Sequence, residues 1–380
     1  MLFRDVIGQA EVKSSLIRQF AEGRVPHALM FSGPPGCGKL PMALAFAQYL
    51  LCEHPGADDA CGHCRSCMMM ANRMEHPDLH FAFPVVKRGG ATVRCDDYLR
   101  QWNDFVTRQP YFSYQSWLDE IKAGNSQAMI YANESDEIIR KLSFKSAMGG
   151  CKVLVIWLPE KMHEACANKL LKLIEEPQGK TCIIMVTEDK PSVLGTVRSR
   201  AQDIVFKGIA SDDLAAVLER NCGLQPDQAA KVAASSEGSF VKCLKTIEVD
   251  SDTGFCFDMF VRLMRLAYAR DVREMKAWSE AMADIGREKQ KMFFDYAQHM
   301  VRENFVYNFH IDSILGMDDR ERKFATRFAP FINERNAVSI VEKMSEAASN
   351  IEGNVNAKMV FFDFALKMIV EIAVKGARRG

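Results

Sequence analysis

The sequence predicts an α/β domain built on a parallel β-sheet and followed by an all-helical region. An apolar run at 28–32 leads into a glycine-rich loop and then into an apolar helix-like segment at 42–51. Two further apolar runs, 153–157 and 182–186, flank an amphipathic segment, and this strand, helix, strand alternation is typical of parallel sheets. Strand patterns largely disappear after Lys207, which predicts helices for the remainder.

The first half of the chain contains the predicted strands. They are expected at 28–32, 79–83, 153–157, 182–186 and, more weakly, 203–206. The runs at 153–157 and 182–186 are apolar throughout rather than alternating, as in strands that are covered on both faces. Between them, the segment 160–176 predicts a helix that ends before Pro177. Its apolar face is formed by Met162, Cys166, Leu170, Leu173 and Ile174.

An aromatic and polar stretch at about 86–129 interrupts this alternation, and we interpret it as a partly helical insertion. Tryptophan and tyrosine interleave there with arginine, as in platforms that stack nucleic-acid bases. Acidic residues dilute any basic stripe, however. A packed elaboration or a protein-contact surface is therefore the favoured interpretation.

Amphipathic segments dominate the second half of the chain. They predict helices at 212–220, 225–235, 289–308 and 337–349. The polar stretch 249–254 resembles a linker. We therefore expect three domains: an α/β domain at 1–207, a small helical domain at 208–250 and a larger helical domain at 251–380.

Composition sets limits on the class of protein. The chain has 380 residues, 48% of them hydrophobic, which is enough for well-packed cores. Lysine plus arginine and aspartate plus glutamate both total 49, so no overall positive charge favours nucleic-acid binding. The N-terminus lacks a signal-peptide pattern, and no run approaches the ~20 apolar residues of a membrane span. We expect a cytoplasmic protein without membrane partners, whose 12 cysteines are buried thiols or metal ligands.

The glycine-rich loop matches a phosphate-binding loop in all but its last position. Gly33, Gly36, Gly38 and Lys39 are present, whereas Leu40 replaces the serine or threonine that ligates Mg²⁺. Two interpretations follow. The favoured one is a tight strand-to-helix turn that needs glycine for its backbone alone. The other is weak, Mg²⁺-independent nucleotide binding through backbone amides and the lysine.

Four cysteines within residues 52–67 have the spacing of a metal site. Cys52, Cys61, Cys64 and Cys67 can surround one Zn²⁺ tetrahedrally, which leaves no open position for water and predicts a structural site. His54 replacing one thiolate is a minor alternative, as are four unrelated buried thiols.

Several motifs together resemble the clamp-loader branch of the AAA+ ATPases over residues 1–207. Within that branch the chain is most similar to the delta-prime family of bacterial DNA polymerase III. The motifs are Phe3, 6–9, 27–29 before the glycine loop, 168–177 and 197–200. The resemblance implies an AAA+ domain with an inserted zinc module at 52–67, a lid domain at 208–250 and a collar domain at 251–380 that forms oligomers.

The resemblance also implies that intrinsic ATP hydrolysis is lost. Active relatives carry an aspartate and a glutamate at the end of the strand at 153–157, where this chain has Trp157, Leu158 and Pro159. Glu160 is the nearest carboxylate, and Val241 replaces a phosphate-sensing arginine. We expect ATP binding to be weak or absent.

One motif that takes part in ATP hydrolysis in relatives is present in this chain. Relatives of this family use the arginine equivalent to Arg200 as an arginine finger that acts in trans on the nucleotide of a neighbouring subunit. Here Ala201 follows in place of the usual cysteine, and Arg198 is close enough to be confused with Arg200. The alternative is an ordinary surface or interface arginine.

The resemblance thus implies a non-hydrolysing clamp-loader subunit. Its expected partners are gamma/tau-type ATPases and a delta-type subunit, with the sliding clamp and primed DNA reached through the assembled complex. One alternative is an active gamma-type ATPase subunit. Another is a zinc-dependent nucleic-acid-binding protein on a vestigial ATPase fold.

Overall fold

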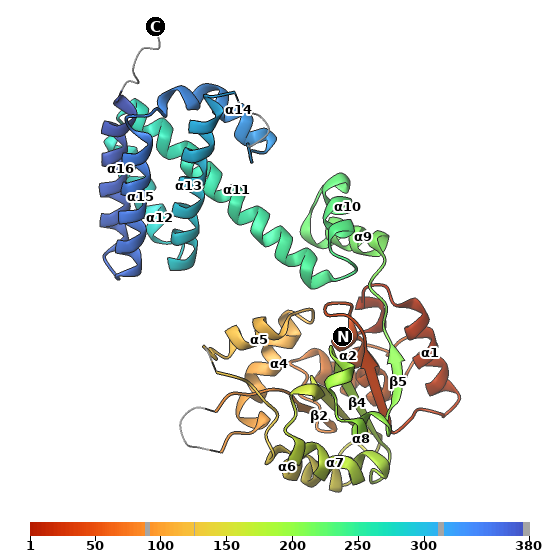
Figure 1. The fold of residues 1–380 in the computed structure, drawn as a ribbon. Helices are drawn as coiled ribbons and strands as arrows, with labels where there is room; N and C mark the ends of the chain where they lie inside the picture. The colour runs from red at the N-terminus through yellow and green to blue at the C-terminus, as the bar shows by residue number, and fades with distance from the viewer. Residues whose placement is uncertain (88–91, 125, 311–314, 375–380) are drawn as a thin grey trace. The chain divides into compact units, whose positions relative to one another are not determined.

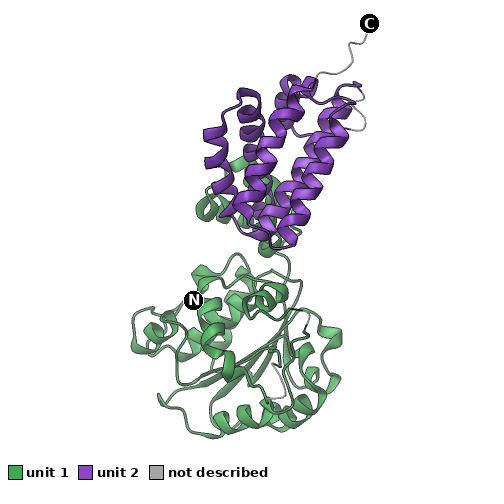
Figure 2. Cartoon of the chain, turned by 90° about the vertical axis from the view of Figure 1, so that its left-hand side faces the viewer, with its two compact units in different colours: residues 1–246 green, residues 247–380 purple. Residues whose placement is uncertain are grey.

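The computed structural model describes residues 1–87, 92–124, 126–310 and 315–374. The chain divides into two compact units, Met1–Thr246 and Ile247–Gly380 (Figure 2). Each unit has its own buried hydrophobic core. The division of the first unit into an AAA+ domain and a lid remains a prediction.

A five-stranded parallel sheet forms the centre of the first unit. The strands are β1 (Ala28–Ser32), β2 (Leu79–Ala82), β3 (Lys152–Trp157), β4 (Thr181–Thr187) and β5 (Gln202–Val205), in the order β2-β3-β4-β1-β5. All residues of β1, β3 and β4 are buried, and helices lie on both sides of the sheet (Figure 1). The predicted parallel sheet is confirmed, and its carboxyl edge brings together the ends of β1, β3 and β4.

Among the described residues of the first unit, the helices at 39–51, 164–175, 211–222 and 226–235 correspond to predicted segments, and two more lie in the insertion that was predicted to be partly helical. The helices described in this unit are α1 (Ala10–Ala21), α2 (Lys39–Leu51), α3 (Arg65–Ala71), α4 (Leu99–Arg108), α5 (Tyr114–Glu120), α6 (Glu134–Ser143), α7 (Glu164–Glu175), α8 (Gly195–Arg198), α9 (Ser211–Cys222) and α10 (Pro226–Ser235). The glycine loop joins β1 to α2, whose residues are almost all buried.

The helix predicted at 160–176 starts later than expected. A short 3₁₀ turn occupies Pro159–Lys161, and Met162 is extended and pairs with Ile130 in a parallel bridge. His163 then caps α7, because its ring nitrogen accepts a hydrogen bond from the backbone N–H of Ala165. Met162 therefore does not lie on the face of α7.

The insertion packs against the sheet through its aromatic side chains. Its described part, which excludes 88–91 and 125, forms a 3₁₀ turn at Cys95–Tyr98 and then α4 and α5. Trp102 is fully buried and stacks on Phe83 with ring centroids 4.2 Å apart, and Trp117 and Trp157 surround it. Because these rings are buried, they are not available as a platform for bases.

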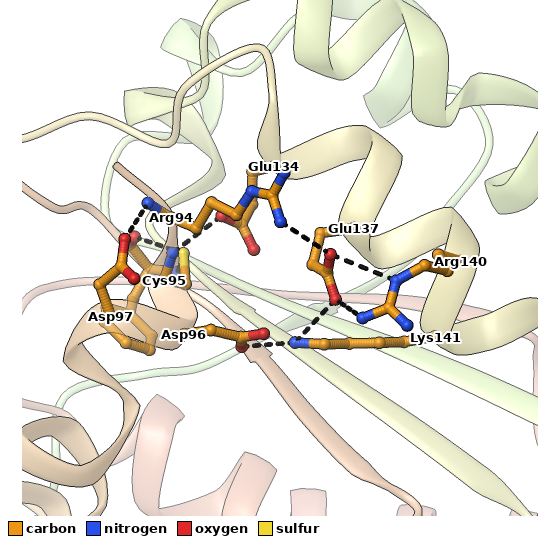
Figure 3. A network of polar contacts seen from close by, with 9 residues as sticks. Arg94, Cys95, Asp96, Asp97, Glu134, Glu137, Arg140 and Lys141 are labelled. Atoms are coloured by element: carbon orange, nitrogen blue, oxygen red, sulfur yellow. Dashed lines mark hydrogen bonds and ion pairs between the residues drawn. The ribbon is translucent and has the colours of Figure 1, made fainter. Parts of the chain in front are cut away.

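Polar contacts fasten the insertion to α6 (Figure 3). The Glu134 carboxylate accepts a hydrogen bond from the backbone N–H of Cys95 at 2.8 Å. Arg94 reaches Glu137 at 3.3 Å, and Lys141 reaches Asp96 at 2.5 Å. The start of the insertion is therefore held to α6 by one buried hydrogen bond and two partly exposed ion pairs.

The second unit is helical in its described residues. Its helices are α11 (Phe240–Ala269), which begins in the first unit, α12 (Val272–Ala283), α13 (Arg287–Tyr307), α14 (Asp319–Phe328), α15 (Ala337–Glu352) and α16 (Ala357–Ala373). Trp278, Phe293 and Phe361 are fully buried in its core. The linker predicted at 249–254 is wrong, because α11 continues through it. Within the described residues, no helix has the length and apolarity needed to span a membrane.

Candidate functional site

The four cysteines converge at the end of α2. Cys52 follows that helix, Cys61 and Cys64 lie in the next turn, and Cys67 is in the first turn of α3. All four Sγ atoms lie within 4.8 Å of one another, and the Cys52–Cys64 and Cys61–Cys67 pairs are both separated by 3.9 Å. Metal–sulfur bonds of about 2.3 Å in a tetrahedron would set separations of about 3.8 Å. The cluster can therefore bind one metal ion.

Backbone hydrogen bonds stabilise the sulfur atoms of this cluster. The N–H groups of Cys61, Cys64 and Cys67 donate to the Sγ atoms of Cys52, Cys61 and Cys64 at 3.3, 3.3 and 3.4 Å. The turn between the second and third cysteines needs Gly62, whose φ is 78°. A backbone hydrogen bond from His63 lowers the pKa of the Cys61 thiol to about 6. The thiolate, the form that binds metal, is therefore favoured at Cys61, whereas burial raises the pKa of the Cys52 and Cys67 thiols.

The surrounding contacts identify the cluster as part of the unit's framework. Glu53 accepts hydrogen bonds from Ser66 at 3.0 Å, and the Asp59 carboxylate accepts from the backbone N–H of Phe3 at 3.0 Å. Cys52, Cys64 and Cys67 also belong to the main hydrophobic core; His54 is exposed and lies outside the group of potential ligands. With four sulfur atoms around the centre, no position is left for a substrate or water.

The glycines of the phosphate-type loop are needed for close packing within this chain. A Cβ added to Gly36 would lie 2.1 Å from Ser239 Oγ, and one added to Gly33 would lie 2.5 Å from the carbonyl oxygen of Phe206. Their φ angles, 75° and 150°, are also rarely adopted by other residues. These contacts support the interpretation of the loop as a tight turn.

Lys39 folds back onto its own loop. Its Nζ donates to the carbonyl oxygens of Gly33 and Pro34 at 2.7 and 2.5 Å, and the residue is only 4% exposed. Burial lowers the pKa of Lys39, although Cys37, Glu188 and Glu160 oppose that shift. The neighbouring Leu40 is also buried. The ammonium group is thus already bonded to protein acceptors.

The insertion fills the space beside the loop. A cavity of about 30 Å³ remains, lined among others by Lys39, Tyr111, Trp157 and Val241. Ile7 donates its backbone N–H to the Tyr111 hydroxyl at 2.9 Å, and the tyrosine ring packs edge-on against Phe240 with centroids 5.1 Å apart. Such a volume holds about one or two water molecules. The Tyr111 ring therefore occupies much of the space beside the loop.

The end of β3 provides no pair of carboxylates. Trp157 and Leu158 are buried there, and Glu160 turns toward the next strand, where it accepts hydrogen bonds from the N–H groups of Glu188 and Asp189 at 3.0 and 3.3 Å. Sequence reasoning missed Glu188, which follows β4, lines the cavity and has a pKa raised by burial. Adjacent parallel strands end at one edge, so a search of both strand ends could have found it.

Arg200 lies apart from the cavity, just after α8. Its Nε is 2.5 Å from the Glu175 carboxylate, and its Nη1 donates to the carbonyl oxygen of Thr196 at 2.8 Å. The side chain is 31% exposed, so part of the guanidinium group faces solvent. The structure therefore brings the four cysteines together and keeps Arg200 separate from the glycine loop.

Comparisons with known proteins place this chain among replication proteins. A sequence model of the family described as "DNA polymerase III, delta subunit" matches residues 8–210. DNA polymerase III subunit delta' of Escherichia coli is 28% identical over 49% of this chain and 44% of its own length. DNA polymerase III subunit gamma/tau of Mycobacterium bovis is 26% identical over 58% of this chain and 31% of its own length. A solved gamma subunit-related structure from Thermotoga maritima covers 95% of this chain and 99% of its own at 11% identity and a TM-score of 0.35. The chain spans less than half the length of the two curated relatives.

Proposed function

The chain belongs to the DNA polymerase III delta subunit family, with relatives named delta', and we propose that it acts as a clamp-loader subunit that does not hydrolyse ATP. It would work beside gamma/tau-type ATPases and a delta-type subunit. Sliding-clamp and primed-DNA contacts would arise through the assembled complex. The proposal on hydrolysis rests chiefly on one observation: Lys39 is bonded to its own loop while Tyr111 fills the adjacent space.

Loss of three groups accounts for the absence of hydrolysis in this proposal. Leu40 offers no oxygen for Mg²⁺, and Trp157 and Leu158 offer neither a metal ligand nor a base. Without them the charge on the γ-phosphate is not neutralised and no water is activated. Glu188 is present at the same edge, but it is a single carboxylate with a raised pKa.

An ATPase assay on the purified chain tests this directly. We expect no turnover above background, with or without Mg²⁺, and the same result for Lys39→Ala. Turnover that Lys39→Ala abolishes would refute the proposal and favour an active gamma-type subunit, the alternative that the gamma/tau relatives support. Titration with a fluorescent ATP analogue, with Mg²⁺ and with a chelator, separates binding from hydrolysis.

We further propose that Arg200 completes the ATP site of a neighbouring subunit. Glu175 and the carbonyl of Thr196 hold one side of the guanidinium group, which leaves its remaining N–H donors for a phosphate. Glu175 would thus act as a positioning residue that presents Arg200 at the surface. A planar, permanently charged donor suits the spread negative charge of phosphoryl transfer.

The test is ATP turnover by a reconstituted complex that contains gamma-type subunits. Arg200→Ala should lower turnover by as much as ~10³-fold, with assembly unchanged by gel filtration. Arg200→Lys should rescue it poorly, because an ammonium group lacks the fork of donors. Arg198→Ala is the matched control, since it removes the neighbouring guanidinium group. Equal turnover for Arg200→Ala and the parent would refute the assignment.

The metal is proposed to be a structural Zn²⁺. Tetrahedral sulfur coordination in a closed site favours zinc. Protein purified without chelator should contain one zinc per chain, and Cys64→Ser should lower that content. Cys222→Ser is the control, because Cys222 is exposed and lies outside the cluster. Steeply salt-dependent DNA binding by the isolated chain would instead favour a zinc-dependent nucleic-acid-binding protein.

A further inference from the structure

The helical unit contains a wide groove between α11 and α14 that the proposed function does not use. Its volume is about 1130 Å³, and residues of η6 (Ala329–Phe331) and α16 also contribute to its walls. The groove is larger than the 300–1,000 Å³ typical of small-molecule pockets. Its size therefore suits a polypeptide segment better than a metabolite.

The floor of the groove is apolar and aromatic. On α11, the apolar lining recurs at helical spacing, at Phe257, Val261, Met264 and Tyr268. On α14, Phe324 and Phe328 form a matching stripe. Tyr268 is 69% exposed, although its ring packs against Phe331 with centroids 5.3 Å apart. Exposure of so large an aromatic ring beside buried apolar side chains is a feature of protein-contact surfaces.

The rim of the groove is positively charged. Its lining contains five cations and one carboxylate, namely Arg262, Arg265, Arg320, Lys323, Arg327 and Asp258. Arg320 pairs with Asp258 at 2.8 Å, and Arg262 pairs with Glu274 at 3.2 Å. In the described part of the chain, Arg265, Lys323 and Arg327 have no ion-pair partner and are exposed. An excess of unpaired positive charge therefore flanks the apolar floor on both helices.

We propose that this groove binds an acidic protein segment that carries apolar side chains. Aspartate and glutamate would pair with Arg265, Lys323 and Arg327, and the apolar side chains would lie against Phe324, Phe328 and Tyr268. The charge of the rim selects against a second copy of this groove, since like charges would face each other. The apolar floor distinguishes the site from a surface for nucleic acid, which tracks the phosphate backbone with basic residues. The proposal does not depend on clamp loading.

Fluorescence anisotropy with the full chain tests the proposal. The probe is a labelled peptide of about 12 residues that alternates pairs of acidic residues with leucine or phenylalanine, long enough for about three helical turns. Comparison probes replace the acids with lysine, replace the apolar residues with serine, or are single-stranded oligothymidine. We expect saturable binding of the first probe alone, weakening as salt rises because the pairs are partly exposed.

Two sets of variants locate the site. Arg265→Ala, Lys323→Ala and Arg327→Ala combined should weaken binding about tenfold or more, as three partly screened ion pairs are lost. Lys276→Ala, Arg335→Ala and Lys358→Ala combined are the matched control, because they remove three exposed cations of the same unit outside the groove and should leave binding unchanged. Circular dichroism checks the fold, and Tyr268→Ala gives an independent test of the apolar floor, with an expected loss of about threefold or more.

Several outcomes would overturn the proposal. They are tighter binding of oligothymidine than of the acidic peptide, equal binding of the lysine-substituted peptide, and equal weakening by the two sets of variants. Self-association of the parent that the Arg265, Lys323 and Arg327 substitutions abolish would assign the groove to a second copy of this chain instead.

Discussion

Glu134 is a buried carboxylate whose two oxygens have different surroundings. One accepts the hydrogen bond from the Cys95 backbone, while the other, Oε1, is buried and has no hydrogen-bond partner among the described residues. Burial raises the pKa of Glu134, and the hydrogen bond from Cys95 only partly offsets that shift. An ionised carboxylate is therefore held there at a cost in stability at neutral pH.

This predicts that Glu134→Gln stabilises the protein at neutral pH. The pKa of Glu134 is higher in the folded state than in the unfolded state, so the folded state binds more protons at pH values between the two. The free energy of unfolding therefore falls as the pH rises through that range. Glutamine keeps an oxygen for Cys95 and removes the charge. We expect a gain of about 1 kcal/mol in the free energy of unfolding at about pH 7, shrinking toward zero at about pH 4.

Urea unfolding of both proteins at the two pH values measures this gain. Glu175→Gln is a suitable comparison, because Glu175 is an exposed carboxylate. Its replacement breaks the ion pair with Arg200 but removes no buried charge. A gain of the same size at both pH values would contradict the assigned role of ionisation.

The insertion is the element that most alters the candidate nucleotide site. Its α4 and α5 are joined by a segment that carries Tyr111 and Phe112 into contact with the loop, Ile7 and Trp157. The same aromatic cluster covers the end of β3, where the buried Trp157 packs against Phe112. The segment that lies beside the loop thus also packs against the end of β3.

Tyr111→Ala is predicted to reopen the space beside the loop. Truncation of a buried aromatic side chain should destabilise the first unit by about 3 kcal/mol. It should also create weak, Mg²⁺-independent binding of ATP or pyrophosphate, because the loop amides and Lys39 become accessible while Leu40 remains. Binding is measured by isothermal titration calorimetry, in parallel with a thermal melt.

Tyr111→Phe is the matched control for that experiment. It removes only the hydroxyl that accepts from Ile7, so it should cost about 1 kcal/mol and leave anion binding absent. If both variants bind nucleotide as poorly as the parent while Tyr111→Ala is folded, the ring does not control access to the loop.

Elements that are determined by residues close together in the sequence could be predicted. Cys61, Cys64 and Cys67 lie within one turn and the start of a helix, so their spacing alone restricts how far apart they can be. The parallel strands were also recognisable, because buried strands require continuous apolar runs. The start of α7 was misjudged, because Met162 fits a helical face but pairs instead with Ile130, a distant partner.

The position of Tyr111 beside the glycine-rich loop could not be predicted in the same way. Ile7 and Tyr111 are 104 residues apart, and no periodicity links a tyrosine in an insertion to the backbone near the N-terminus. The predicted linker at 249–254 failed for a related reason. Polar residues on the exposed face of a long helix have the same composition as a linker, and only packing distinguishes them.

At the scale of the whole molecule, two hydrophobic cores coexist in one chain. The cysteine cluster belongs to the first core, which includes Cys52, Cys64 and Cys67, whereas the second core is formed by residues from α11 to α16. Separate cores are expected to unfold with some independence, although α11 runs across the boundary between the units.

Metal removal should therefore destabilise the first unit selectively. Without the metal, four sulfur atoms that lie within 4.8 Å of one another are no longer linked, and the turn that carries them keeps only its hydrogen bonds and its packing against the core. A high-affinity chelator should lower the melting temperature of the first unit by about 10 °C, which corresponds to the loss of about 3 kcal/mol for a unit of this size. Residues 257–374 should be unaffected.

Hydrogen exchange resolved by peptide distinguishes the two units during this treatment. Amides of 52–71 should lose protection first, followed by the sheet, while those of α12, α13, α15 and α16 keep theirs. Cys64→Ser should reproduce the chelator's effect and show no further change when chelator is added, whereas Cys222→Ser should respond as the parent does. Equal loss of protection in both units would mean that the metal stabilises the chain as one cooperative body, through α11.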